Sequence, residues 1–211
     1  MMVSKRLLIA AALAVGILSS SPSAQVGQGL LDANTATEAQ LTGLPHMTPA
    51  IVKELIAKRP FMSIVELNTF LLGKGLSQAQ ATELYGKAFI HVNLNTGTAE
   101  EILLIPNAGK RMAREFPEYR PWRNWAQFDK EISKYVGQPE TDRLKQYVFI
   151  PVKLNTGTDE DINSIPGAGS RMVREFKEYR PWKTKEQFEK EIGKYVNKQE
   201  VARLWRYVVI D

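Results

Sequence analysis

The chain has 211 residues, of which 28 are basic, 23 are acidic and none is cysteine. The absence of cysteine excludes disulfide bonds and thiolate chemistry. The formal net charge of +5 at pH 7 is too small to identify a nucleic-acid-binding protein by itself, so the placement of the basic residues has to decide.

The first 24 residues have the order of a secretory signal peptide. Lys5 and Arg6 precede an apolar run of twelve residues, Leu7 to Leu18, and small residues follow up to Ala24. A bilayer needs about 20 apolar residues to be spanned, so we predict a signal peptide over residues 1–24 and an exported protein, periplasmic or secreted and soluble after cleavage. An uncleaved membrane anchor is the alternative. Removal of Lys5 and Arg6 leaves 26 basic against 23 acidic residues, a formal net charge of +3.

Three segments of about 60 residues follow the leader, at residues 31–90, 91–150 and 151–211. The second and third stay in register without a gap from Leu94 and Leu154 to Ile150 and Ile210. Such a period indicates tandem units. A unit of this size buries a marginal core alone, so we expect neighbouring units to pack together.

The first half of each segment predicts a short helix, a tight turn and a second helix. Each first helix starts with a capping pair, Thr37 with Gln40, Thr98 with Glu101 and Thr158 with Asp161. Each ends before a proline, at Leu44-Pro45, Ile105-Pro106 and Ile165-Pro166. We therefore expect helices to begin near Thr98, Gly109, Thr158 and Gly169. Pro117 is expected to kink the second helix of the second segment or to end it early.

The second half of each segment is also helical by its apolar spacing. Phe188, Ile192 and Tyr195 recur at helical intervals and have counterparts in the second segment. The 60-residue register predicts equivalent buried positions for Phe128 and Phe188. Residues 88–92 and 148–152 are rich in β-prone side chains and predict short, stiff extended links between the units.

At the turns the residues resemble a known family. Ile165-Pro166-Gly167-Ala168-Gly169 between two short helices is similar to the helix-hairpin-helix signature. The longer frame, Asn-Thr-x-Thr, Ile-Pro-Gly-x-Gly and Tyr-Arg-Pro-Trp, resembles the competence DNA receptor (ComEA-like) module, in which two hairpins form one unit. The resemblance implies an all-α fold of three tandem units of about four short helices each. The second turns, around Gly137 and Asn197, depart from the family pattern.

The first turn of each unit is a candidate phosphate site. A Gly-x-Gly turn that opens a helix offers unpaired amide hydrogens and the positive end of the helix dipole, and adjacent arginines add charge-assisted bonds. The candidates on and after this turn are Gly167, Gly169, Ser170, Arg171 and Arg174 in the third segment, and Asn107, Gly109, Lys110, Arg111 and Arg114 in the second. In the first segment His46 and Thr48 replace the glycines and Pro49 removes an amide donor, so this hairpin is degenerate.

A structural interpretation of these turns stays open beside the functional one. The turns could merely connect helices, with the basic residues in solvated pairs at helical spacing, such as Arg171 with Glu175, Arg174 with Glu178 and Arg111 with Glu115. The Tyr-Arg-Pro-Trp tetrads ending at Trp122 and Trp182 could stack on nucleobases. Core packing is favoured for them, because Phe61 fills the same position in the first segment.

No catalytic constellation is visible in the sequence. His46 and His91 stand 45 residues apart without metal-ligand spacing, so we expect no enzyme activity, no cofactor or metal and no small-molecule substrate. The resemblance and the hairpin chemistry together imply sequence-independent DNA binding through backbone phosphates, in DNA uptake or extracellular DNA binding. The alternative is a periplasmic structural or protein-interaction module with a periplasmic or membrane protein partner. The extrinsic helix-hairpin-helix subunit of photosystem II has this fold and serves an assembly in that way.

Overall fold

The computed structural model describes residues 29–211, so the predicted signal peptide over residues 1–24 lies outside the described residues. Within this range the chain is mainly helical, in agreement with the predicted fold class, and has eleven helices and six strands of two residues each. Among the described residues no helix is both long and apolar enough to cross a membrane.

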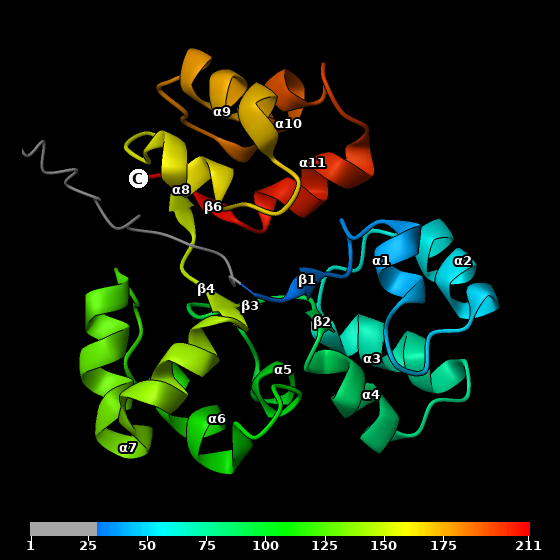
Figure 1. Ribbon diagram of the computed structural model, residues 1–211. Coiled ribbons are helices and arrows are strands. Elements are labelled where there is room, and N and C mark those ends of the chain that lie inside the picture. The colour runs from blue at the N-terminus through cyan, green and yellow to red at the C-terminus, as the bar shows by residue number, and fades with distance from the viewer. Residues whose placement is uncertain (1–28) are drawn as a thin grey trace, which may run out of the picture.

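The elements follow the order strand, helices and strand in three successive segments (Figure 1). The first contains β1 (Leu31–Asp32), α1 (Glu38–Thr42), α2 (Pro49–Lys58), α3 (Ile64–Gly73), α4 (Gln78–Tyr85) and β2 (Ala88–Phe89). The second contains β3 (Val92–Asn93), α5 (Ala99–Leu103), α6 (Gly109–Glu118), α7 (Trp125–Lys145) and β4 (Val148–Phe149). The third contains β5 (Val152–Lys153), α8 (Asp159–Asn163), α9 (Gly169–Glu178), α10 (Lys185–Ile192), α11 (Lys198–Trp205) and β6 (Val208–Val209).

The helix starts lie where local signals predict them. α5, α6, α8 and α9 begin at or directly after the expected residues Thr98, Gly109, Thr158 and Gly169. All three predicted capping boxes form, with the threonine side chain and the side chain three residues later bonding reciprocally to the backbone. Each box satisfies two amide donors that a helix start otherwise leaves unpaired.

The prediction that Pro117 ends its helix early is wrong. α6 and α9 both have ten residues and stop at equivalent positions, Glu118 and Glu178. Pro117 occupies the next-to-last helical position, so the helix ends where its counterpart ends without a proline. The larger irregularity is in α7, where Gly137 has φ 75° and ψ 166° and Pro139 follows. Two helical stretches therefore meet at Gly137, where the third segment has a separate α10 and α11.

The expected extended links are strands, and their pairing was not predicted. β1 pairs with β2, β3 with β4 and β5 with β6, all in parallel, with registers Leu31 to Ala88, Val92 to Val148 and Val152 to Val208. Parallel strands need a long crossover connection, which the helices of each segment supply. Each segment is thereby closed by its own two ends, and the chain passes directly from one closing strand to the next opening strand.

The hydrophobic core confirms the equivalence of Phe128 and Phe188. Both are fully buried. Phe128 packs against Phe116 and Trp122 with ring centroids 5.5 and 5.3 Å away, and Phe188 has matching contacts at 5.3 and 5.4 Å. One continuous cluster of buried residues spans the first two segments, and a second fills the third.

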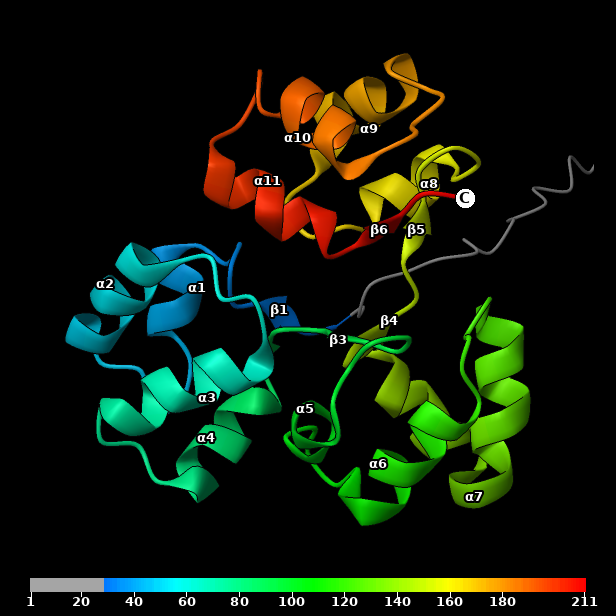
Figure 2. The same cartoon turned by 180° about the vertical axis from the view of Figure 1, so that it is seen from behind.

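The three segments form three lobes around the strands (Figures 1 and 2). Aromatic pairs join consecutive lobes, since Phe89 packs on Tyr147 at 5.1 Å and Phe149 on Tyr207 at 4.6 Å between centroids. The third lobe also returns to the first, because the Tyr207 hydroxyl donates to Asp32 Oδ2 at 3.3 Å. Arg206 donates to the carbonyl oxygen of His91 at 3.0 Å. These contacts fix the direction in which each lobe presents its turns.

Candidate nucleic-acid interface

The turns that open α6 and α9 share an unusual backbone. Asn107 and Gly109 have φ of 61° and 66°, and Gly167 and Gly169 have φ of 75° and 61°. Left-handed values at two positions flanking one residue explain why glycine dominates here, and asparagine is among the side chains that tolerate the conformation. The residue between them, Ala108 or Ala168, is buried and donates its N–H to the carbonyl of Ile105 or Ile165.

The helix starts after these turns are uncapped. The residues at the cap positions, Ala108 and Ala168, make no side-chain cap hydrogen bond. The nine other helices of residues 29–211 all begin with a side chain that accepts from a backbone N–H of the first turn. A Cβ added to Gly109 or Gly169 would meet nothing within 4 Å, so the space beside each turn is open. Both starts therefore present amide donors and the positive end of a helix dipole to an open surface.

The first hairpin is closed by comparison. His46 has the left-handed conformation, with φ 64°, and its Nε2 lies 2.8 Å from Glu83 Oε2. Thr48 accepts from the N–H of Ile51 at 3.3 Å and so caps α2, while Pro49 has no N–H to offer. The expectation of a degenerate first hairpin agrees with this geometry.

The basic candidates fall into two groups. Lys110, Arg111 and Arg171 are exposed and make no ion pair within the described part of the chain. Arg114 and Arg174 are also exposed, but each binds the carboxylate of the next residue, with Nη2 to Oε1 distances of 2.7 Å. The solvated pairs expected at helical spacing do not form among these residues.

The partners of these arginines, Glu115 and Glu175, are buried carboxylates. Their exposed fractions are 3% and 2%. The Arg114 guanidinium lowers the pKa of Glu115, and the Tyr195 hydroxyl together with Arg174 lowers the pKa of Glu175. Both carboxylates therefore stay ionised at neutral pH. Arg114 and Arg174 are held in place by these carboxylates. Arg111 and Arg171 also lower the pKa of Glu115 and Glu175, but from a longer distance and without a direct ion pair.

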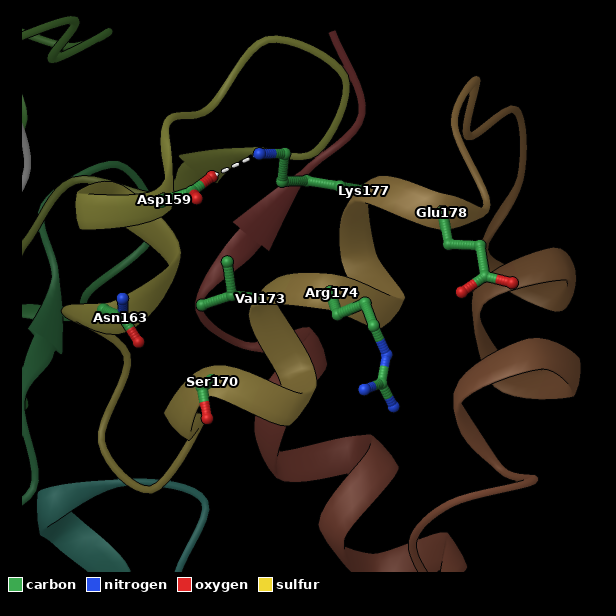
Figure 3. A pocket seen from close by; sticks show the side chains of 7 residues that line it. All are labelled: Asp159, Asn163, Ser170, Val173, Arg174, Lys177 and Glu178. Atoms are coloured by element: carbon green, nitrogen blue, oxygen red, sulfur yellow. Dashed lines mark hydrogen bonds and ion pairs between the residues drawn. The ribbon is translucent and has the colours of Figure 1, made fainter.

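A hollow of about 610 Å³ lies beside the third-segment turn, between α8 and α9 (Figure 3). Ser170 borders it near the turn, and Lys177 Nζ bonds to Asp159 Oδ1 at 2.5 Å at the opposite end. Val173 faces the space between them, whereas the Arg174 guanidinium extends away from the Lys177–Asp159 pair. The hollow is open to solvent, and acidic and basic side chains both line it. It is a recess beside the turn, and its lining groups do not converge as catalytic groups would.

The tip of the third-segment turn also touches the first segment. A Cβ at Gly167 would lie 3.0 Å from Thr35 Cγ2 and 3.2 Å from Arg203 Nη2. A side chain at Gly167 would press on both groups and would also be strained at its φ of 75°. The Gly169 and Ser170 side of the turn remains exposed. In the second segment the turn is held differently, because Arg143 Nη2 donates to the carbonyl oxygen of Pro106 at 2.7 Å.

The Tyr-Arg-Pro-Trp tetrads pack in the core, as favoured from the sequence. Trp122 and Trp182 are 2% and 1% exposed, and their indole N–H groups donate to the carbonyl oxygens of Phe116 and Phe176. Phe61 is fully buried at the same position of the first segment. Buried rings cannot stack on a nucleobase, so the stacking interpretation is wrong for these tryptophans.

The sequence did not predict a set of hydrogen bonds, here called the clamp, that joins the Asn-Thr start of each repeated motif to its Arg-Pro-Trp or Arg-Pro-Phe end. Asn155 Oδ1 accepts from the backbone N–H of Trp182 at 2.7 Å, and Asn155 Nδ2 donates to the carbonyl oxygen of Trp182 at 3.1 Å. Arg180 donates to the carbonyl oxygens of Leu154 and Gly157. The same bonds recur in the other segments through Asn34, Arg59, Asn95 and Arg120. The signal was present, since this asparagine and this arginine stand in all three segments.

Other site types find no support in the residues described. Within residues 29–211 no three His, Cys, Asp or Glu side chains gather closely enough to hold a metal ion. His46 pairs with Glu83, and His91 is buried beside Asp32 at the junction of the lobes. Comparison of the chain with protein-family models, with curated proteins and with solved structures found no match.

Proposed function

We propose that the chain is an exported, non-enzymatic protein of three tandem helix-hairpin-helix units, residues 31–90, 91–150 and 151–211, that binds DNA without sequence preference. The hairpins of the second and third units bind backbone phosphates, and the first hairpin does not. The single observation that carries the proposal is the pair of uncapped helix starts at α6 and α9, next to open space and exposed basic residues.

A phosphate suits this arrangement for three physical reasons. The free amide hydrogens of the first turn point outward from each helix start, and the helix dipole favours an anion there. Arg171, or Lys110 with Arg111, adds an exposed cation that has no direct ion pair within residues 29–211. Contacts of this kind fix the position of a protein on the duplex without reading bases, so the binding is indifferent to sequence.

The salt dependence of DNA binding follows from the number of phosphates that the protein contacts. If each of the two hairpins neutralises one or two phosphates, the logarithm of the binding constant falls with the logarithm of salt concentration with a slope of about −2 to −3.5. The dissociation constant lies in the range of non-specific binding, ~10⁻⁴ to 10⁻⁶ M at physiological salt.

Fluorescence anisotropy of residues 25–211 with labelled duplexes of unrelated sequence, at two salt concentrations, tests the proposal. We expect weaker DNA binding and a salt slope of smaller magnitude when Arg171 and Arg174 are both replaced by Glu. The same holds when Lys110 and Arg111 are both replaced by Glu. The matched control reverses Lys53 and Lys58 on α2, beside the closed hairpin, with the same change in net charge. If the control lost as much DNA affinity as the hairpin variants, the binding would depend on net charge alone, and the proposed hairpin sites would be wrong.

A protein-interaction module is the second candidate function, and two observations favour it. The charges of Arg114 and Arg174 are taken up by Glu115 and Glu175, and Leu103 on α5 is 49% exposed. Failure to bind duplex DNA at low salt would leave this candidate ahead, and cross-linking in periplasmic extract would then identify the partner. Export itself is tested by the N-terminal residue of the protein recovered from the periplasmic fraction.

A further inference from the structure

Beside the third-unit hairpin, two tyrosines lie between basic side chains from both halves of the unit. The hydroxyl oxygens of Tyr179 and Tyr195 are 2.9 Å apart. The Arg171 guanidinium carbon lies 5.0 Å from the centre of the Tyr195 ring, and Lys194 Nζ lies 5.0 Å from the centre of the Tyr179 ring. We call these four residues the basic–tyrosine cluster of the third unit.

The second unit has a cluster of the same composition. The hydroxyl oxygens of Tyr119 and Tyr135 are 2.7 Å apart, and Lys134 Nζ lies 5.9 Å from the centre of the Tyr119 ring. Arg111 reaches the same tyrosine pair through its Nη1, which donates to the carbonyl oxygen of Tyr135 at 3.5 Å. The hairpin arginine and a lysine from α7 are thus brought onto one surface.

Each cluster rests on the buried carboxylate behind the hairpin. Glu175 is 2% exposed and is held by Arg174, and the Tyr195 hydroxyl lowers its pKa. The tyrosine pair is therefore tied to α9 at one end and to the residues after α10 at the other. Rings fixed in this way hold the two cations at set positions, which reduces the conformational entropy lost when a ligand binds them.

The first unit has no tyrosine pair at this place, and its Lys58 and Lys74 lie 5.4 and 5.6 Å from the centre of the Phe70 ring instead. Lys58 stands where Tyr119 and Tyr179 stand, directly before the Arg-Pro pair, and Lys74-Gly75-Leu76 follows α3 in place of a Lys-Tyr pair. The first hairpin is also the one closed by Thr48 and Pro49. The basic–tyrosine cluster and the open hairpin therefore occur together or not at all within this chain.

We propose that the two basic–tyrosine clusters form a second contact with the DNA backbone, in which Lys134 and Lys194 each bind a phosphate other than the one at the hairpin. This inference rests on the proposed function. Lys134 also pairs with Glu131 on α7, and Lys194, which follows the end of α10, pairs with Glu191 on α10. The glutamate side chains are only 14% and 13% exposed, but the lysine side chains are 51% and 50% exposed, so a phosphate can approach each lysine from the solvent side.

The tyrosines act by positioning the cations and not by stacking on bases. All four rings are half-buried, and Tyr119, Tyr179 and Tyr195 each have a cation beside the ring. The contact is consequently as indifferent to sequence as the hairpin contact. It extends the bound backbone beyond the hairpin along each unit.

Substitution of Lys134 and Lys194 by Gln, singly and together, tests the inference in the same anisotropy titration. Each lost phosphate contact reduces the magnitude of the salt slope by about 0.9 and weakens binding roughly eightfold at 0.1 M salt. The double variant therefore loses about 1.8 from the slope. Substitution of both lysines by Arg keeps the slope of the wild type, since the charge and its place on the ring are retained.

Lys130 and Lys190 supply the matched control. Each lies one turn before its cluster lysine and near the same glutamate, with Nζ to Oε1 distances of 3.9 Å, and neither is placed on a tyrosine ring. The Lys130→Gln, Lys190→Gln double variant has the same net charge and changes affinity less than about twofold. Thermal melts verify that all variants are folded.

The outcomes separate this inference from the proposed function. A wild-type protein that does not bind duplex DNA at low salt overturns both. Binding that is lost on reversal of Arg111 and Arg171, but is the same in the Lys134, Lys194 double variant and in the control, overturns the second contact alone. A slope that falls by about two only in the cluster variant supports it.

Discussion

Exchange of the open third hairpin for the closed first one is the most direct test of which chemical groups bind phosphate. The double substitution Gly169→Thr, Ser170→Pro places the pair Thr48-Pro49 of the first segment at the equivalent positions of the third. In the first segment this pair opens α2 with Thr48 at φ −75° and with a threonine cap on the N–H three residues later. Gly169 has φ 61°, so the exchange asks the third turn to take the backbone of the first. The exchange leaves the net charge and Arg171 unchanged.

The expected magnitude follows from the donors that the exchange removes. The proline eliminates one N–H, and the threonine hydroxyl occupies a second, so the phosphate at this hairpin loses its amide partners. We expect the salt slope to decrease in magnitude by about 0.9 and the affinity to fall roughly eightfold at 0.1 M salt. The new cap contributes about 0.5–2 kcal/mol to the helix, which offsets strain in the exchanged turn, so the thermal midpoint should change little.

Anisotropy titration over a range of salt concentrations measures the slope, and circular dichroism measures the fold. The reverse exchange, Thr48→Gly with Pro49→Ser, opens the first hairpin and serves as the control for the turn. A folded variant with the closed third hairpin and an unchanged slope would refute the reasoning, because the amides would then contribute nothing that Arg171 does not supply alone.

Two further predictions concern the same unit. Arg171→Gln should weaken DNA binding roughly eightfold at 0.1 M salt, whereas Arg174→Gln should weaken it less and lower the thermal midpoint, because it leaves the buried Glu175 carboxylate without its guanidinium. Equal effects of the two on affinity would contradict the division between free and paired arginines. Asn155→Ala should destabilise the fold by about 2–4 kcal/mol, because it leaves the backbone N–H and carbonyl of the buried Trp182 unpaired, and thermal unfolding measures this.

Local signals predicted the helix starts and the three turns. The capping pairs, the prolines and the glycines act within five residues of each other, so neither folding partners nor tertiary contacts are needed to interpret them. The closed first hairpin was foreseen for the same reason, since His46, Thr48 and Pro49 alter the turn directly.

The features that were missed depend on contacts between residues far apart in the chain. The parallel strand pairs join residues 56 or 57 positions apart, and the Asn155 clamp joins residues 27 positions apart. The pairing of Arg174 was misjudged because helical spacing treats Glu175 as a surface residue. In the structure the side chain of Glu175 is buried, and the position of Tyr195 depends on how the second half of the unit folds.

The C-terminal residue Asp211 provides a structural prediction that needs no ligand. In the first two segments the residue two positions before the clamp asparagine accepts its backbone N–H, since Asp32 Oδ1 accepts from Asn34 at 2.9 Å and Asn93 Oδ1 from Asn95 at 2.8 Å. In the third segment this position is Lys153, which cannot accept. Asp211 Oδ1 accepts from the N–H of Asn155 at 2.9 Å instead.

Stability supplied by Asp211 should depend on pH in a way that stability supplied by Asn93 does not. Burial raises the pKa of Asp211, but the hydrogen bonds from the Thr156 hydroxyl and the Asn155 N–H lower it by more. The net pKa of Asp211 therefore lies below its ordinary value of 3.8. A carboxyl whose pKa is lower in the folded state stabilises the fold fully above its unfolded pKa, and this contribution disappears as the pH falls through the folded pKa. Asp211→Ala should therefore lower the thermal midpoint at pH 7 and pH 5 and do so much less at pH 2.5. Asn93→Ala removes an uncharged acceptor from the equivalent turn and should lower the midpoint by a similar amount at all three pH values. If the effect of Asp211→Ala were as constant with pH as that of Asn93→Ala, the ionised carboxylate could not be the group that replaces the missing acceptor in the third segment.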